Sequence, residues 1–361
     1  MKQLYQRWVI GLLAGLLAVL TVCAIVVYAI DPCLYFRLPT GRKPVFFNER
    51  YQDAGLAKNI DADTVLTGTS MTANYRVSKV EKTFGGTAVK LTIPDGYLSE
   101  FNHILNVEWR YHQPKRIIFG MDLNIMIRDE SQLTGAMPDY LYNKNRLDDV
   151  KYLLNKDALY DSVYTLMQNR AGTAGTLDDA FTWDGNYWWN HMTALENYPR
   201  PKQVKTPVAA GAYERNVQDN LKVVKSWVKA HPRTEFDIFF PPYSILFWDK
   251  TARLGETDAM ISALGQIARE LTPYENVKLF FPLGDKAVVT NLDLYCDYIH
   301  HSGAVCTQVL EMIRSNQNRL TAENQKKTIE QWKQYVVSYP YQQFWEQSYW
   351  IQWNTRRQTE R

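Results

Sequence analysis

The sequence predicts an α/β protein whose parallel sheet forms the middle of three layers, attached to an N-terminal transmembrane helix. Short uninterrupted apolar runs alternate with helical patterns along much of the chain, and residues 8–30 form an uncharged apolar stretch. Strands that are buried on both faces of a parallel sheet have this composition, and the helices between them cover the two faces. Two further segments with helical patterns predict a helical insertion and a helical C-terminal tail.

The composition of the 361-residue chain is that of a globular protein, 46% hydrophobic and 22% charged. Its net charge of +3 comes without a cluster of Lys and Arg, which argues against a nucleic-acid-binding protein. The six histidines and four cysteines form no set with the spacing of zinc ligands, so we expect no metal site. We also expect no cofactor.

Residues 1–30 are predicted to form a membrane anchor with a short cytoplasmic N-terminus. About 20 apolar residues span a bilayer as a helix. Lys2 and Arg7 precede the apolar stretch, and the positive-inside rule then places the rest of the chain outside the cytoplasm. A cleaved signal peptide is the alternative, but its apolar region is usually only about 7–15 residues long.

After the anchor, we expect a linker over residues 31–60, an α/β domain over 61–317 with an insertion at about 128–211, and a tail over 318–361 rich in aromatic residues. The expected strands are 64–67, 88–93, 116–120, 236–240 and 277–281. The expected helices are 97–111, 216–230, 257–271 and 304–315. All follow from the periodicity of apolar residues and from Gly and Pro at the ends of the runs.

Four loops of special composition follow predicted strands and therefore meet at one edge of the sheet. They are Gly68-Thr69-Ser70, Pro94-Asp95-Gly96, Gly120-Met121-Asp122 and Pro241-Pro242-Tyr243. The aromatic side chains of Tyr243 and Trp248 would line an acyl or sugar pocket there, although an aromatic cluster after a strand is equally typical of a core.

Ser70, Asp297 and His300 have the chemistry of a catalytic triad. A serine hydroxyl needs an imidazole to take its proton and a carboxylate to orient that imidazole. Asp297-Tyr298-Ile299-His300 provides the last two at a spacing of three. Alternatives are that Ser70 caps a helix, that Asp297 is a turn residue, and that the adjacent His301 is the base.

The four blocks Gly68-Thr69-Ser70, Gly96, Gly120-Met121-Asp122 and Asp297-Tyr298-Ile299-His300 resemble those of the SGNH (GDSL-like) hydrolases. The layout resembles their membrane-anchored bacterial branch, which includes DltD and the AlgJ-type envelope-polymer acyl-transfer proteins. The resemblance covers about residues 60–130 and 212–315. It implies a flavodoxin-like three-layer fold and a serine acyl-enzyme.

By this resemblance, the backbone N–H groups of Ser70 and Gly96 would face the oxyanion. Asp122 stands where the best-known enzymes have Asn, and a carboxylate repels an oxyanion unless it is protonated or turned aside. Asp122 would instead accept backbone N–H bonds or contact a substrate hydroxyl, with Asn124 as a substitute oxyanion donor.

We therefore expect a membrane-anchored extracytoplasmic acyl esterase or acyltransferase that acts on acyl esters of a cell-envelope glycan or polymer. The resemblance further implies a membrane-embedded acyltransferase as partner. The alternatives are a catalytically silent glycan-binding or assembly protein of the same fold, and a scaffold subunit of an export complex.

Two further features have open interpretations. Cys296 and Cys306 flank the Asp-x-x-His segment and are either bridged or two separate buried thiols. Trp183, Trp188 and Trp189 of the insertion either stack on sugar rings or pack within the insertion. The aromatic tail lies either in the membrane interface or on the surface of its own domain.

Overall fold

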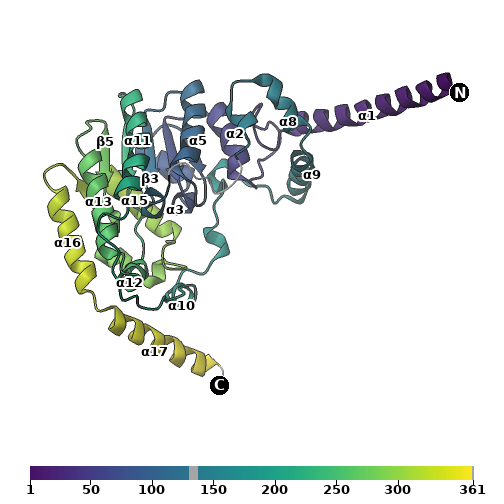
Figure 1. Cartoon of the computed structure of the whole chain (residues 1–361). Helices are drawn as coiled ribbons and strands as arrows, with labels where there is room; N and C mark the ends of the chain where they lie inside the picture. The colour runs from purple at the N-terminus through teal and green to yellow at the C-terminus, as the bar shows by residue number, and fades with distance from the viewer. Residues whose placement is uncertain (130–136, 360–361) are drawn as a thin grey trace. The chain divides into compact units, whose positions relative to one another are not determined.

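The computed structural model describes residues 1–129 and 137–359, and Figure 1 traces its helices and strands. The chain divides into two compact units. Unit 1 comprises residues 1–61, 103–112 and 135–181, and unit 2 comprises residues 62–102, 113–134 and 182–361. The insertion expected at 128–211 is thus shared between the two units.

Unit 2 contains one six-stranded sheet with the strand order β2-β1-β3-β4-β5-β6. The strands are β1 (Thr64–Gly68), β2 (Ala88–Thr92), β3 (Arg116–Gly120), β4 (Glu235–Phe239), β5 (Val277–Phe280) and β6 (Arg319–Leu320). Strands β1 to β5 are parallel. Their order, 2-1-3-4-5, is one of the common orders of doubly wound α/β sheets. The α/β class and the five parallel strands are therefore confirmed.

The expectation of a wholly parallel sheet is wrong at one edge, because β6 runs antiparallel to β5. Between the preceding helix and β6, Asn316 and Asn318 adopt positive φ angles of 55° and 51°. These residues reverse the chain, and Asn tolerates this conformation better than most residues. A two-residue strand that begins with Arg319 has no apolar run, so the sequence pattern contains no signal for it.

The helices of unit 2 cover both faces of the sheet. On one face, α4 (Val77–Phe84) and α15 (Gly303–Arg314) pack on a core that includes Leu66, Ile118 and Phe239. On the other face, Phe119 contacts Trp227 of α11 (Glu214–Ala230) and Phe101, which lies in the first turn of α5 (Leu98–Tyr111), the part of that helix that belongs to unit 2. Next to α11 lies α13 (Thr257–Leu271), as Figure 1 shows. These contacts make the three layers.

Shorter helices complete unit 2. They are α3 (Ser70–Ala73), α6 (Leu123–Met126), α10 (His191–Glu196), α12 (Ile245–Arg253) and α14 (Lys286–Val289), together with the 3₁₀ turns η3 (Asp184–Asn186), η4 (Pro282–Gly284) and η5 (Leu292–Leu294). Helices α3 and α6 each begin just after a strand, so they start at the carboxyl edge of the sheet.

The tail forms α16 (Gln325–Ser338) and α17 (Tyr341–Thr359). Trp332 of α16 is buried against Trp248 and Phe281. Trp345 of α17 meets Tyr198 edge-on. These two tryptophans of the tail therefore dock on unit 2 itself.

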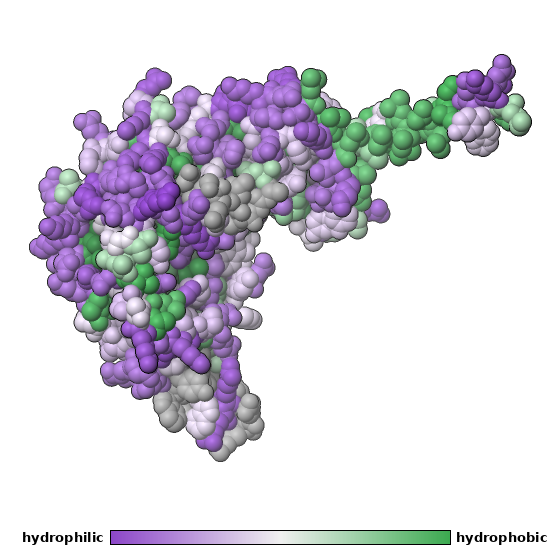
Figure 2. Space-filling view, in the orientation of Figure 1, coloured by the Kyte–Doolittle hydropathy of each residue, from purple (hydrophilic) through white to green (hydrophobic). Residues whose placement is uncertain are grey.

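Unit 1 consists of helices, and α1 (Lys2–Ile30) is long and apolar enough to cross a membrane. Figure 2 shows α1 as a continuous hydrophobic rod with a hydrophilic N-terminal end. The other elements are α2 (Glu49–Asn59), α7 (Asp139–Tyr142), η1 (Arg146–Asp148), α8 (Asp149–Leu153), α9 (Lys156–Ala171) and η2 (Leu177–Asp179).

The segment expected as a linker, residues 31–60, instead forms ordered structure with buried residues. Its second half is α2, which buries Leu56 and Ala57 among others. Asp31 ends α1 in the left-handed conformation, and its carboxylate accepts hydrogen bonds from the N–H of Tyr35 and the hydroxyl of Tyr152, each at 3.0 Å. The prolines and glycines here mark turns between packed elements, which sequence alone does not distinguish from a free linker.

Candidate active site

The nucleophile candidate Ser70 lies on a sharp turn between β1 and α3. Gly68 ends β1 with φ of 148°, and a Cβ there would stand 2.1 Å from Thr72 Oγ1 and 2.9 Å from the carbonyl oxygen of Gly120. Only glycine fits this close approach. The cap of α3 is Thr69, whose hydroxyl accepts from the N–H of Met71 at 3.3 Å. The hydroxyl of Ser70 therefore does not serve as the helix cap and is directed elsewhere.

Ser70, His300 and Asp297 come together across about 230 residues of chain. Ser70 Oγ lies 2.9 Å from His300 Nε2, and His300 Nδ1 lies 2.6 Å from Asp297 Oδ2. An ionised carboxylate only accepts hydrogen bonds, so Nδ1 carries the proton and Nε2 is left to accept from the serine. The side chains of His300 and Asp297 are each 22% exposed, so both are partly open to solvent.

The second oxygen of Asp297 fixes the turn that carries the imidazole. Asp297 Oδ1 accepts from the backbone N–H of Ile299 at 2.8 Å and of His300 at 2.7 Å. Burial alone would raise the pKa of Asp297, but the hydrogen bonds and charge of His300, together with these N–H groups, lower that pKa below its usual value. The carboxylate is therefore ionised at neutral pH and orients the ring from both oxygens.

His301, the alternative base, lies in the core. It is 2% exposed, and its ring meets Tyr75 edge-on with 6.3 Å between the ring centroids. Burial lowers the pKa of His301 to about 4. Its Nδ1 lies 3.7 Å from the sulfur of Cys306, and neither nitrogen has a hydrogen bond to Ser70 among the described residues. The two adjacent histidines thus have different surroundings, and only His300 is placed to take the serine proton.

Asp122 does not serve as an oxyanion donor, because its carboxylate accepts hydrogen bonds from three partners. Its Oδ2 accepts from Thr69 Oγ1 at 2.9 Å, and its Oδ1 accepts from the N–H of Asn124 at 2.9 Å and from the hydroxyl of Tyr243. Through Thr69 the carboxylate is tied to the residue before the nucleophile. Asp122 therefore shapes the loop, which is one of the two roles expected for it from the sequence.

Tyr243 and Trp248, expected as substrate contacts, are both fully buried. The hydroxyl of Tyr243 donates to Asp122 and accepts from the N–H of Leu123 at 2.8 Å. Trp248 packs between Phe247 and Trp332. Neither side chain is open to a ligand, because α12 turns this aromatic cluster into the core rather than toward the edge of the sheet. The expected contacts with substrate are therefore corrected to a structural role.

The loop of Gly96 differs from the expectation that the N–H of this residue faces the oxyanion. The residue with positive φ is Asp95, at 52°, and the N–H of Gly96 donates to the carbonyl of Ile93 at 3.0 Å. This N–H is therefore occupied within a turn. The N–H of Ser70 stands at the first position of α3, where helical N–H groups have no intrahelical partner.

Trp183 of the insertion contacts the imidazole, a contact that the sequence did not indicate. Its ring meets His300 edge-on, with 5.0 Å between the ring centroids. The side-chain oxygen of Asn74 accepts from the N–H groups of Trp183 and Asp184 at 2.9 and 3.0 Å. Arg76 pairs with Asp184 at 3.2 Å. The segment just after the nucleophile thus holds the tryptophan against the base.

In the same segment Trp189 packs against Trp183 and donates from Nε1 to the carbonyl of Asp184 at 2.8 Å. Trp188, in contrast, is 80% exposed. Packing within the insertion therefore describes Trp189, whereas Trp183 packs both there and against His300, and the side chain of Trp188 is open to solvent.

All four cysteines are free thiols, including Cys296 and Cys306, and both of these are buried. Burial, with the charge of Asp297, raises the pKa of Cys296 to about 12, and burial likewise raises that of Cys306. The open alternative of a bridge is therefore resolved as two buried thiols. Over the described ranges 1–129 and 137–359, no group of three or more His, Cys, Asp and Glu side chains gathers as metal ligands would.

Comparison with known protein families and with curated proteins gave no match to this chain. A serine hydroxyl, an imidazole that can accept its proton and a carboxylate that holds the imidazole are the parts of a nucleophilic acyl-transfer site.

Proposed function

We propose that this protein is a membrane-anchored serine esterase or acyltransferase of the SGNH type. The observation that carries the proposal is the continuous line of contacts from Ser70 Oγ to His300 Nε2, at 2.9 Å, and from His300 Nδ1 to Asp297 Oδ2, at 2.6 Å. The order of the five parallel strands and the position of Ser70 just beyond β1 support it, because ligands of such sheets bind at the carboxyl ends of the strands.

The reaction would proceed in two steps. Ser70 Oγ attacks the acyl carbonyl carbon while its proton moves to His300 Nε2, and the leaving alcohol takes that proton as its bond to the carbonyl breaks. Water or a second hydroxyl then gives its proton to His300 Nε2 and attacks the acyl-serine carbonyl, and His300 returns that proton to Ser70 Oγ as the bond between Oγ and the acyl group breaks. Asp297 holds the imidazolium that forms in both steps, and the N–H of Ser70 faces the developing oxyanion.

The proposed substrates are acyl esters of a cell-envelope glycan or polymer outside the cytoplasm. Helix α1 supports an anchored protein by its length and composition, and Lys2 and Arg7 at its N-terminal end support a cytoplasmic N-terminus. The resemblance noted in the sequence supports a membrane-embedded acyltransferase as partner.

The test is turnover of p-nitrophenyl acetate by the full chain in detergent. We expect Ser70→Ala and His300→Ala to lose at least about 10³-fold in kcat/KM. Ser78→Ala, an exposed serine on α4, is the matched control and should keep wild-type activity. Equal turnover by wild type and Ser70→Ala would overturn the proposed nucleophile.

A non-catalytic glycan-binding protein is the second candidate, and the exposed rings of Trp188 and Tyr187 favour it. Exposed aromatic rings offer flat apolar faces on which sugar rings stack. If wild-type protein neither turns over the ester nor reacts with a fluorophosphonate, and Trp188→Ala weakens retention on envelope glycan, this second function is favoured over the first.

A further inference from the structure

Helix α9 of unit 1 has its apolar face on the outside. Tyr160, Val163, Tyr164, Leu166 and Met167 are between 37% and 69% exposed. The buried positions of the same helix are Ala158, Ser162 and Thr165, which are small or polar. An ordinary surface helix turns its apolar stripe toward the core and its polar side toward water. In α9 the exposed side is instead more apolar than the buried side.

The exposed residues form a continuous stripe along α9. Tyr160, Val163, Tyr164 and Met167 follow the spacing i, i+3, i+4, i+7, which places them on one side of a helix. The rings of Tyr160 and Tyr164 stack, with centroids 6.3 Å apart and planes at 9°. The preceding segment adds exposed apolar side chains at Leu147, Val150 and Leu154. A cluster of exposed apolar side chains of this kind is typical of a surface that has a partner.

The position of α9 beside α1 indicates what this partner is. Helices α8 and α9 both pack against α1. Among the described residues of unit 1, α1 is covered only toward its C-terminal end, where Val27 is buried and Cys23 and Ala24 are partly buried. The residues of α1 before Cys23 are exposed. Hence α9 lies against the last two turns of the apolar helix, a length of about 10 Å along its axis.

Cationic side chains mark where α1 leaves the apolar region. Arg37 and Arg42 donate to carbonyl oxygens at the C-terminal end of α1, and Arg42 reaches that of Ala29 at 3.2 Å. Arg37 also lies over the ring of Tyr28, 4.5 Å from its centroid. Arginine and tyrosine together are typical of the headgroup level of a membrane. The last two turns of α1 would therefore lie on the acyl-chain side of the headgroups, and α9 would lie at the same depth.

The charges of α9 fit the same position. Lys156 and Arg170 stand at its two ends, where long cationic side chains can reach toward headgroups. Asp161 lies beside the stripe, and burial, with the charge of Asp157, raises its pKa to about 6. A carboxyl that is more easily neutralised costs less to bring close to an apolar phase.

We infer that the outward stripe of α9, continued by Leu147, Val150 and Leu154, inserts into the outer half of the lipid bilayer that α1 spans. This inference rests on the anchor of the proposed function and not on the catalysis. Interfacial helices bury their apolar face about 5–10 Å into the boundary between headgroups and acyl chains, which agrees with the length of α1 that α9 covers. Helices α1 and α9 together then fix the tilt of unit 1 on the membrane. A single transmembrane helix followed by a flexible linker would not fix this tilt.

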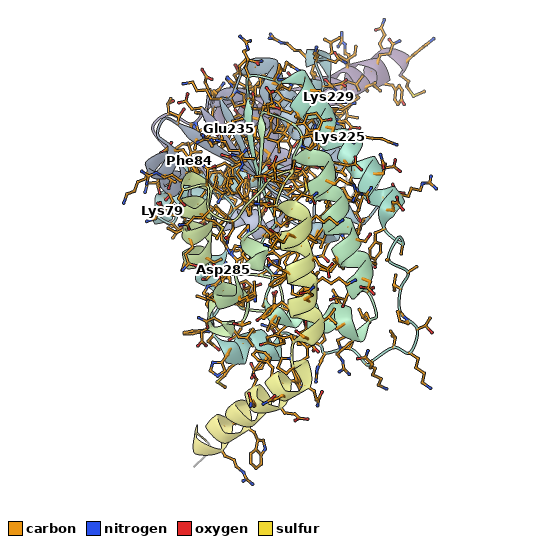
Figure 3. The ribbon with its side chains drawn as sticks, turned by 90° about the vertical axis from the view of Figure 1, so that its left-hand side faces the viewer. Lys79, Phe84, Lys225, Lys229, Glu235 and Asp285 are labelled. Carbon is orange, nitrogen blue, oxygen red and sulfur yellow. The ribbon has the colours of Figure 1, made fainter. Side chains whose placement is uncertain are left out.

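The experiment places single spin labels on the full chain in vesicles of phosphatidylcholine and phosphatidylglycerol. Labels at Val163→Cys and Met167→Cys are compared with Leu13→Cys on the exposed part of α1 and with Lys229→Cys on α11, whose position Figure 3 marks. The background is Cys23→Ser, because the other three cysteines are buried. Collision with oxygen reports lipid, and collision with a water-soluble nickel chelate reports water.

We expect the ratio of oxygen to nickel accessibility at positions 163 and 167 to be several-fold above that at 229 and similar to that at 13. Equal ratios of oxygen to nickel accessibility at positions 163, 167 and 229 would overturn the inference and indicate that a protein partner covers the stripe. Spin–spin broadening at position 163 would also overturn it, and would indicate that a second copy of this chain covers the stripe. A water-exposed label at 13 would overturn the anchor as well. None of these readouts measures esterase activity. Failure of this inference and failure of the proposed catalysis can therefore be distinguished.

Discussion

The ring of Trp183 meets the imidazole of His300 edge-on, with the ring centroids 5.0 Å apart and the ring planes at 88°. This contact joins a residue of the insertion to the base of the proposed triad. Asn74 and Arg76, just after the nucleophile on the chain, hold the backbone and the neighbour of that tryptophan. The insertion is therefore part of the support of the site.

Replacing Trp183 should impair the base without removing it. In Trp183→Ala the imidazole loses the ring that limits its rotation, and we expect kcat for p-nitrophenyl acetate to fall roughly 10- to 100-fold, because small misplacements of reacting groups have effects of this size. KM should change little, whereas the midpoint of urea unfolding should fall, because the ring of Trp183 also packs against Trp189. Trp188→Ala is the control, since this exposed ring of the same segment should leave the small-ester activity intact. Equal loss in both variants would contradict a positioning role for Trp183.

Asp297→Asn tests the orientation of the imidazole. The amide keeps the shape of the side chain but presents no charge to the imidazolium and offers an N–H where His300 Nδ1 needs an acceptor. We expect kcat to fall about 10³- to 10⁴-fold. The pKa of Asp297 is lowered, so the carboxylate also stabilises the fold above the ordinary carboxyl pKa of about 4, and that stability is lost as pH falls through the lower folded value. Unchanged kcat in Asp297→Asn would remove this residue from the triad.

His301 should make stability depend on pH. Its pKa is about 4 in the folded protein and about 6.5 when unfolded, so the unfolded chain binds more protons between these values and stability decreases as pH falls. From pH 7 to pH 5 this group alone should remove about 2 kcal/mol from the free energy of unfolding. Urea titrations at both pH values, with His301→Phe as the comparison, measure it. An identical pH dependence in wild type and His301→Phe would contradict the assignment.

The hydroxyl of Tyr243 should matter for both stability and catalysis. Tyr243→Phe deprives Asp122 of one donor and the N–H of Leu123 of its acceptor, which should cost about 1–3 kcal/mol. Because Asp122 holds Thr69 next to the nucleophile, esterase activity should fall as well. Tyr198→Phe is matched, since its buried hydroxyl donates to Asp249 at 2.9 Å. Comparable stability losses with a selective loss of activity in Tyr243→Phe are expected, and equal activities would argue against the network.

The parallel strands were predictable because their signal is local. Apolar runs such as residues 116–120 and 277–280 lie close to the expected bounds, and the glycines and prolines after them mark the carboxyl ends. The candidate triad could also be predicted, since an Asp-x-x-His spacing and a serine after the first strand are visible in the sequence itself. The antiparallel strand β6 and helix α2 were missed because neither has a periodic apolar pattern that stands out from its surroundings.

The remaining parts of the site depend on contacts between distant residues. The hydrogen bonds from Trp183 and Asp184 to Asn74 cross more than a hundred positions, and nothing in the local sequence of either segment indicates the other. Tyr243 was expected in a pocket because it follows a strand, but the direction of its side chain is set by α12 and by Asp122. Only packing distinguishes a core aromatic residue from one that lines a pocket.

The most direct test of the central claim is covalent labelling of Ser70. Full-length protein in detergent is treated with a fluorophosphonate, and the modified residue is located by peptide mass spectrometry. An activated serine should be labelled rapidly at Ser70, much more slowly in His300→Ala, and not in protein that has first been unfolded in urea. Ser78, an exposed serine on α4, should stay unmodified and serves as the internal reference. Labelling of Ser70 and Ser78 at the same slow rate would show that the geometry does not activate the hydroxyl, and would contradict the proposal.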